Sequence, residues 1–188
     1  MATPHRHEDE GFTLLEVVGA LLLLAVAAAG VAGLVAVSQR AALAARLQTS
    51  ATVLAIEKLE QLRALRWASA GGATQSDLTT NLSVDPPATG GGGLAPSPPG
   101  TLQADTAGYV DYVDSSGRWL AGGTAPPPGA VYVRRWSVEP LADDPADTRI
   151  LRVRVLTVAR SRSAAGGGAG RPAPGDVLML TLLTRKAR

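Results

Sequence analysis

The sequence contains no cysteine, so it can form neither disulfides nor thiolate metal sites. Its two histidines, His5 and His7, both lie within the first seven residues. The rest of the chain therefore has no imidazole for general-base catalysis or zinc binding. Aromatic residues make up 4% of the chain, although hydrophobic residues make up 46%. These shortages argue against an enzyme and predict a chain that needs no cofactor.

What the sequence does have is one long hydrophobic run. Every residue from 17 to 37 is Val, Ala, Leu or Gly, and a helix of that length crosses the ~30 Å hydrocarbon layer once. A cleaved secretory signal, cut after Ala27–Ala29, is the alternative. It is disfavoured because the run continues past Ala29 and because the residues before it are acidic rather than basic. The run predicts a transmembrane helix.

Beyond Val37 the pattern becomes amphipathic, with small and apolar side chains at steps of three and four. This spacing predicts that the helix continues from near Phe12 to about Trp67 and presents an apolar stripe. Lys58 falls within the stripe, and we expect its long side chain to carry the charge outward to solvent. The stripe consists of Leu43, Leu47, Ala51, Leu54, Ala55, Leu62 and Leu65.

The last 80 or so residues change to a period of two, which is typical of strands. In one of them Leu151, Val153 and Val155 alternate with two arginines, so one face is apolar and the other charged. Such strands predict an antiparallel sheet packed on the second half of the helix, an α+β fold. The predicted strands are Tyr109–Val113, Val131–Val138, Ile150–Ala159 and Val177–Thr184.

Between helix and strands, residues 69–107 are rich in Gly and Pro and predict an irregular or mobile connector. The run Gly90–Gly93 is not a phosphate-binding loop, because no Gly-Lys-Ser/Thr follows it.

The most informative segment is Gly11-Phe12-Thr13-Leu14-Leu15-Glu16, which leads directly into the hydrophobic run. A lone carboxylate at Glu16 stands at the mouth of a membrane span, where a charge costs about 2.5 to 3.5 kcal/mol on insertion scales. A partner for that charge is expected. One alternative is that Glu16 simply remains in water at the interface.

This segment resembles the N-terminus of the type IV pilin and pseudopilin family, whose precursors carry a polar leader, a Gly, and Phe-Thr-Leu-x-Glu opening a hydrophobic helix. The resemblance implies that prepilin peptidase cuts between Gly11 and Phe12 and methylates the new amine of Phe12. It implies that Glu16 pairs with that amine, usually in a neighbouring subunit. It also implies a single-pass protein of the bacterial inner membrane, with its head outside the cytoplasm, that enters a pilus or pseudopilus.

The implied partners are prepilin peptidase, other pilin or pseudopilin subunits, the inner-membrane assembly platform and membrane lipid. The implied plan is a leader at 1–11, a transmembrane helix at 12–38, an amphipathic extension at 39–68, the connector at 69–107 and a sheet head at 108–188.

Two further stretches, Ala55–Arg63 and Tyr132–Val138, resemble the sequences of minor pilins of the pilus-modification type and of the related I-type minor pseudopilin. A minor rather than major subunit is also favoured because the span has Gly30 and Gly33 where many major pilins have Pro, and because no cysteine closes a C-terminal loop. The leader is more acidic than such leaders usually are. A pilus and a type II secretion pseudopilus remain alternatives at this point.

Two charged groups remain to be placed. Six arginines can form a DNA-contacting patch, but a solvated strand face is the favoured interpretation. These are Arg134, Arg135, Arg152, Arg154, Arg160 and Arg162. Asp143, Asp144 and Asp147 lie in one loop without the spacing of an EF-hand, so a polar hairpin loop is favoured over a calcium site.

Overall fold

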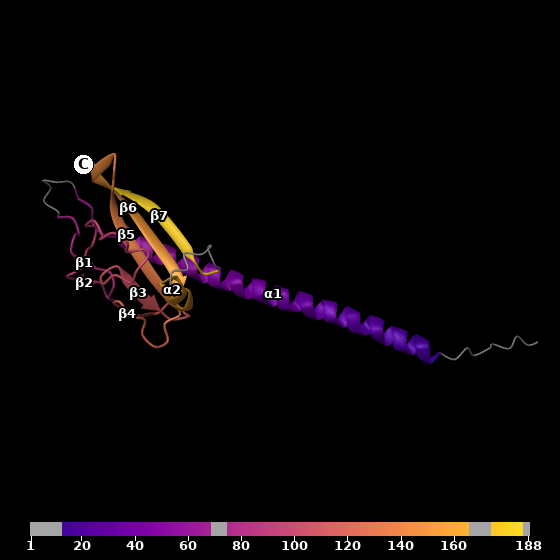
Figure 1. Ribbon diagram of the computed structural model, residues 1–188. Helices are drawn as coiled ribbons and strands as arrows, with labels where there is room; N and C mark the ends of the chain where they lie inside the picture. Colours follow the sequence, from indigo (N-terminus) through magenta and orange to yellow (C-terminus); the bar gives the residue numbers. More distant parts are fainter. Residues whose placement is uncertain (1–12, 69–74, 166–173, 186–188) are drawn as a thin grey trace, which may run out of the picture. The chain divides into compact units, whose positions relative to one another are not determined.

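The computed structural model describes residues 13–68, 75–165 and 174–185 (Figure 1). The chain divides into two compact units, the first ending at Leu43 and the second beginning at Ala44; we call the second unit the head. In chain order the elements are α1 (Leu14–Arg63), β1 (Thr80–Asn81), β2 (Ala88–Thr89), β3 (Val110–Val113), β4 (Trp119–Gly122), β5 (Tyr132–Leu141), β6 (Asp144–Thr157), α2 (Val158–Ala165) and β7 (Val177–Thr184).

The long N-terminal helix predicted from the sequence is present as α1, which ends four residues before Trp67. The chain leaves the helix at this point, and the carboxylate of Asp77 accepts a hydrogen bond from the Arg66 N–H at 2.8 Å. Trp67 then turns into the core, where its indole N–H donates to the carbonyl of Asp147 at 2.9 Å. The end of α1 is therefore fixed to two later segments of the head.

Five strands form one antiparallel sheet in the order β4-β3-β5-β6-β7, with β4 and β7 at its edges. Together with α1, this sheet confirms the predicted α+β fold. The prediction of strand through Val158 and Ala159 was wrong, because β6 ends at Thr157 and α2 begins at Val158. The four-residue strand β4 was not predicted.

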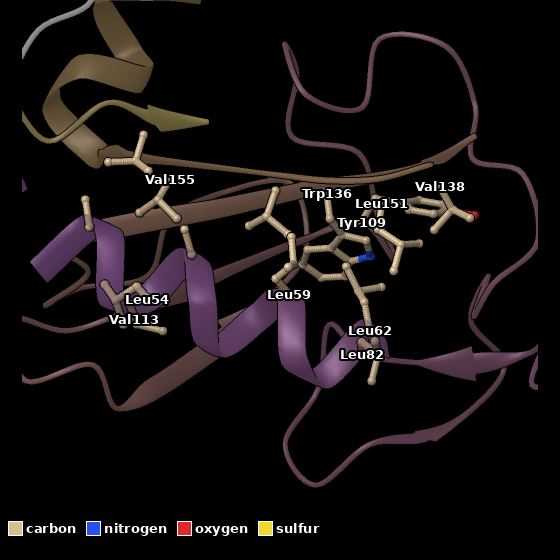
Figure 2. Close-up of a cluster of buried hydrophobic side chains, with 14 of the residues drawn as sticks. Leu54, Leu59, Leu62, Leu82, Tyr109, Val113, Trp136, Val138, Leu151 and Val155 are labelled. Carbon is tan, nitrogen blue, oxygen red and sulfur yellow. The ribbon is translucent and has the colours of Figure 1, made fainter. Parts of the chain in front are cut away.

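The core lies between the sheet and the part of α1 that belongs to the head (Figure 2). Leu54 and Leu62 of α1 are buried against the sheet, and Leu47 packs at the border of the same cluster. From β6, Leu151, Val153 and Val155 are buried in that cluster, while the arginines between them face the other side. The predicted contact of stripe and sheet is thus confirmed.

The Gly/Pro-rich connector contributes to this core, although it was predicted to be irregular or mobile. Leu82 and Leu94 are buried in the same cluster as the helix and sheet side chains. The connector also packs on the edge strand β4, because Ser83 lies against this strand and its carbonyl accepts a hydrogen bond from the indole of Trp119 at 3.2 Å. Gly122 at the end of β4 permits this close approach, since a Cβ there would come 2.3 Å from the Ser83 oxygen.

Replacing Gly122 with alanine should therefore destabilise the head by about 1 to 3 kcal/mol, the usual cost of overpacking a close contact. Thermal unfolding of the full chain in detergent, followed by tryptophan fluorescence, measures this effect. The matched control is Gly30→Ala on α1, where a Cβ meets nothing within 4 Å. Equal melting temperatures for Gly122→Ala and the parent would show that the connector does not press on this edge.

Candidate functional site

The first turn of α1 is closed by Thr13, the residue just before the helix. The backbone N–H of Glu16 approaches the Thr13 hydroxyl at 3.3 Å and the Thr13 carbonyl at 3.0 Å. The N–H of Val17 also donates to that carbonyl, at 3.2 Å. Thr13 is therefore the N-cap, and it satisfies backbone donors that would otherwise be left open at the helix start.

Glu16 occupies the third helical position, where the N-terminal end of the helix dipole favours a negative charge. Its side chain is exposed and forms no ion pair with any residue that the structure describes. The other two residues of the predicted site, Gly11 and Phe12, lie outside the described residues. The carboxylate of Glu16 is thus free, within the described chain, to meet a cation from elsewhere.

After Glu16, α1 presents apolar side chains on every side. Leu14–Arg63 contains an 18-residue window that is long and apolar enough to cross a membrane, and none of that window is buried within the chain. A core helix of a globular domain would be covered by its own domain. The large side chains of this segment, such as Leu23 and Leu34, are exposed, so they need lipid or other helices around them.

The capped helix start, Glu16 and the first part of the exposed apolar helix all lie within one segment that matches a known sequence motif. Residues 6–32 match the family model of the prokaryotic N-terminal methylation motif. The motif supports a type IV pilin-like or pseudopilin-like subunit, a structural class processed by prepilin peptidase and assembled with other pilins. The apolar N-terminal helix fits a membrane-anchored protein of this kind. No curated protein and no solved structure matches the chain.

A second polar cluster lies inside the head, where α1 meets the sheet. Lys58 is 1% exposed, so the expectation that its charge reaches solvent was wrong. Its ammonium donates to Asp111 at 2.7 Å and to the carbonyl of Leu82 at 2.8 Å, and it lies 4.4 Å from the ring centre of Trp136. The buried partner explains the difference, because a carboxylate within reach makes burial of the ammonium tolerable.

Asp111 also binds a second cation. Arg134 stands opposite it on β5 and forms two parallel hydrogen bonds to its carboxylate, at 2.7 and 2.9 Å. A second carboxylate, Glu57, is half-exposed and lies 3.4 Å from the Arg134 guanidinium. Two cations and two carboxylates therefore balance, and three of them are buried.

Burial and charge act in opposite directions within this cluster. Burial lowers the pKa of Lys58 below its ordinary value, although Asp111 acts to raise it. Burial also acts against the charged form of Arg134, but Asp111 and Glu57 hold the pKa of Arg134 above its ordinary value. The buried carboxylate of Asp111 is engaged by both cations, so it links Lys58 of α1 to Arg134 of the sheet.

The structure also alters the interpretation of the six arginines. Arg134 and Arg135 are buried, so they do not belong to a solvated strand face as predicted. Arg135 is held by Asp105 at 2.8 Å. The other two strand arginines, Arg152 and Arg154, pair with carboxylates at 2.6 and 2.9 Å. Since four of the six already hold carboxylates, their charge is largely neutralised and a DNA-contacting patch is disfavoured.

The three aspartates predicted to share one loop do not all lie in a loop, because only Asp143 is in the turn between β5 and β6, whereas Asp144 and Asp147 belong to the first part of β6. The side chain of Asp144 accepts hydrogen bonds from the Asp147 N–H and the Thr148 hydroxyl, at 3.3 and 2.7 Å. Asp147 pairs with Arg185 at 3.3 Å. Within residues 13–68, 75–165 and 174–185, no group of three or more acidic, His or Cys side chains is placed to hold a metal ion.

Two residues of these sites had sequence signals that the prediction overlooked. Thr13 stands three residues before Glu16, which is the spacing of a capping box at a helix start. Asp111 stands in the middle of an otherwise apolar strand, and a carboxylate at such a place needs a buried cation.

Proposed function

We propose that the protein is a minor structural subunit of a type IV pilus-like filament. The observation that carries this proposal is the methylation motif over residues 6–32, which continues into a capped and exposed apolar helix. The helix is the membrane anchor before assembly. Within the filament it packs against the helices of other subunits, so lipid contacts are replaced by helix contacts.

In this proposal prepilin peptidase cuts between Gly11 and Phe12 in the inner membrane, with the head outside the cytoplasm, and methylates the amine of Phe12. Cleavage creates a cation beside the membrane span. The exposed carboxylate of Glu16 is the group that neutralises such a cation, usually that of a neighbouring subunit, and the pair lowers the cost of placing both charges in an apolar filament core. Cleavage thereby makes the subunit competent for assembly at the inner-membrane platform.

A minor pseudopilin of a type II secretion system is the second candidate. The stretches Ala55–Arg63 and Tyr132–Val138 support it as well as they support a minor pilin, because both kinds of subunit share this plan. A retraction ATPase gene beside the gene for this chain would favour a pilus, whereas an outer-membrane secretin gene with secretion-type pseudopilin genes and no retraction ATPase would favour secretion. A DNA-uptake pilin is the weakest candidate, because the arginines of the sheet are paired.

The mature chain should begin with N-methylated Phe12. In membrane fractions digested with trypsin, we expect a first peptide from Phe12 to Arg40 that is about 14 Da heavier than the unmodified peptide. In cells without prepilin peptidase, the leader should remain and this peptide should be absent. A mature N-terminus at Gly30, as a secretory cleavage after Ala29 would leave, contradicts the proposal.

A further inference from the structure

Among the strands that the structure describes, the edge strand β7 has one unpaired backbone edge and a row of exposed leucine side chains. Leu178, Leu180 and Leu182 are 62%, 59% and 54% exposed. They lie on the outer face of the sheet, while Val177, on the other face of the strand, is buried in the core. We call Leu178, Leu180 and Leu182 the leucine row.

The backbone of the leucine row also points to the open edge. Arg185, just after β7, donates its N–H to the carbonyl of Asp147, and the register next to it is Thr148 opposite Thr184. Hydrogen-bonded pairs alternate along an antiparallel ladder, so the odd-numbered residues of β7 bond to β6. The N–H and C=O groups of the leucine row therefore face outward. No other described strand pairs with them.

An uncovered edge of this kind is unusual. Natural sheets protect their edges with charge, proline, bulges or a covering segment. Here the connector packs on the opposite edge strand, β4, through Ser83, but β7 contains no charged residue and no proline. An eight-residue, apolar and uncharged edge is a template for an added strand.

The surroundings of the leucine row indicate the chemistry of that strand. Arg152 stands beside Leu180 and Arg154 beside Leu178. Both arginines already pair with carboxylates of the head, Arg152 with Glu139 of β5 at 2.6 Å and Arg154 with Asp176 just before β7 at 2.9 Å. An added strand with a net charge would find no counter-charge here and would lose solvation, so an uncharged, apolar strand fits best.

The position of β7 in the head indicates where such a strand comes from. Gly175, just before β7, donates to the side chain of Gln48 at 3.0 Å. Arg185, just after β7, lies 4.2 Å from the ring centre of Trp67. β7 therefore runs alongside the head portion of α1, and it is the last strand at one edge of the sheet, the yellow strand in Figure 1. In the proposed filament, where we expect subunits to share the direction of α1, that side is open to a neighbouring subunit.

A second copy of this chain fits the edge less well. Antiparallel pairing of β7 with itself is a two-fold contact about the sheet normal, and it reverses the direction of the α1 segment 44–63 in the second copy. Parallel self-pairing turns the two leucine rows to opposite faces of the joined sheet. Neither arrangement keeps both the helix direction and a continuous apolar face.

We propose that the open edge of β7 binds an uncharged, apolar strand from a different subunit of the same filament, which extends the sheet and covers the leucine row. The inference rests on the proposed function, since it needs a filament with neighbouring subunits. An eight-residue strand pair is small beside the ~1,600 Å² of a standard stable interface. The contact is therefore weak by itself and depends on the high effective concentration of subunits held in one membrane.

The first test places a charge on the edge. Leu180→Lys should fold, be cleaved and reach parental levels in the membrane, because the side chain is outside the core, yet its amount in sheared filaments should fall at least fivefold. The matched control is Leu78→Lys, which changes an exposed leucine of the connector that is remote in sequence from β7, and it should enter filaments like the parent. Parental incorporation of Leu180→Lys overturns this inference alone, whereas absence of the parent from filaments overturns the proposed function.

The second test identifies the occupant and uses the lack of native cysteine. Leu180→Cys in sheared filaments is labelled with benzophenone maleimide and irradiated. We expect a cross-link to a different pilin-like subunit of the same filament, at an extended uncharged segment located by mass spectrometry. A cross-linked dimer of this chain identifies a second copy and overturns the proposal. So does cross-linking to lipid alone, or a yield no higher than that of Leu78→Cys.

Discussion

Replacing Asp111 with alanine should lower the melting temperature of the head by about 10 to 20 °C. The change leaves Lys58 and Arg134 buried without the carboxylate that both of them bind. Breaking a buried ion pair by removing one partner costs about 3 to 5 kcal/mol, which is a large part of the 5 to 15 kcal/mol that stabilises a typical domain. For a domain of this size, each kcal/mol shifts the melting temperature by several degrees.

The measurement is thermal unfolding of the full chain in detergent, monitored by tryptophan fluorescence, since all three tryptophans lie in the head. The matched control is Asp143→Ala, which removes an exposed aspartate at the β5–β6 turn and should leave the melting temperature unchanged. A triple variant in which Lys58, Asp111 and Arg134 become Met, Leu and Met should recover most of the loss, because well-packed apolar residues often replace buried ion pairs at little cost. If Asp111→Ala melts like the parent, the cluster does not hold α1 to the sheet.

Substitutions at Gly11 and Glu16 should abolish filament entry at two different steps. Gly11→Trp should leave the precursor uncleaved, because the proposed cleavage junction no longer fits the peptidase. Glu16→Ala should be cleaved normally and remain in the membrane, but its amount in sheared filaments should fall at least tenfold. In the proposed function the carboxylate acquires its partner only when cleavage exposes the amine of Phe12, so its loss should act after processing.

Paired immunoblots of membrane and sheared-filament fractions separate the two defects, since the size shift reports cleavage. Glu16→Gln keeps the size of the side chain and removes its charge, and it should behave like Glu16→Ala. The matched control is Leu15→Ala, an exposed neighbour on the same helical turn, which should enter filaments at close to the parental level. Normal incorporation of Glu16→Ala would refute the pairing while leaving the pilin-like assignment intact.

The parts of the fold that follow a regular period were predictable from the sequence. The apolar stripe predicted which face of α1 is buried, and Leu54 and Leu62 confirm it. The alternation around Leu151 predicted an antiparallel strand with one apolar face, and β6 confirms it. The methylation motif around Gly11 could also be recognised from the sequence, because it consists of consecutive residues.

The parts that depend on distant partners were not predictable in the same way. Lys58 was predicted to lie within the stripe and to extend its charge to solvent, and only the fold brings Asp111 within 2.7 Å of it. The connector lacked a period, yet tertiary packing buries Leu82 and Leu94 regardless of local pattern. β4 is four residues long, which is too short to show an alternation.

The cluster around Lys58 also has a mechanical consequence. If α1 slid along the sheet by one turn, about 5.4 Å, the position of Lys58 beside Asp111 would be taken by Leu54 or Leu62. Lys58 would lose its carboxylate, and Asp111 would lose one of its two cations, in the interior of the head. Traction applied to the N-terminal part of α1 is therefore resisted by the specific ion pairs of this contact, which a purely apolar contact would lack. The head then moves together with the helix, without sliding along it.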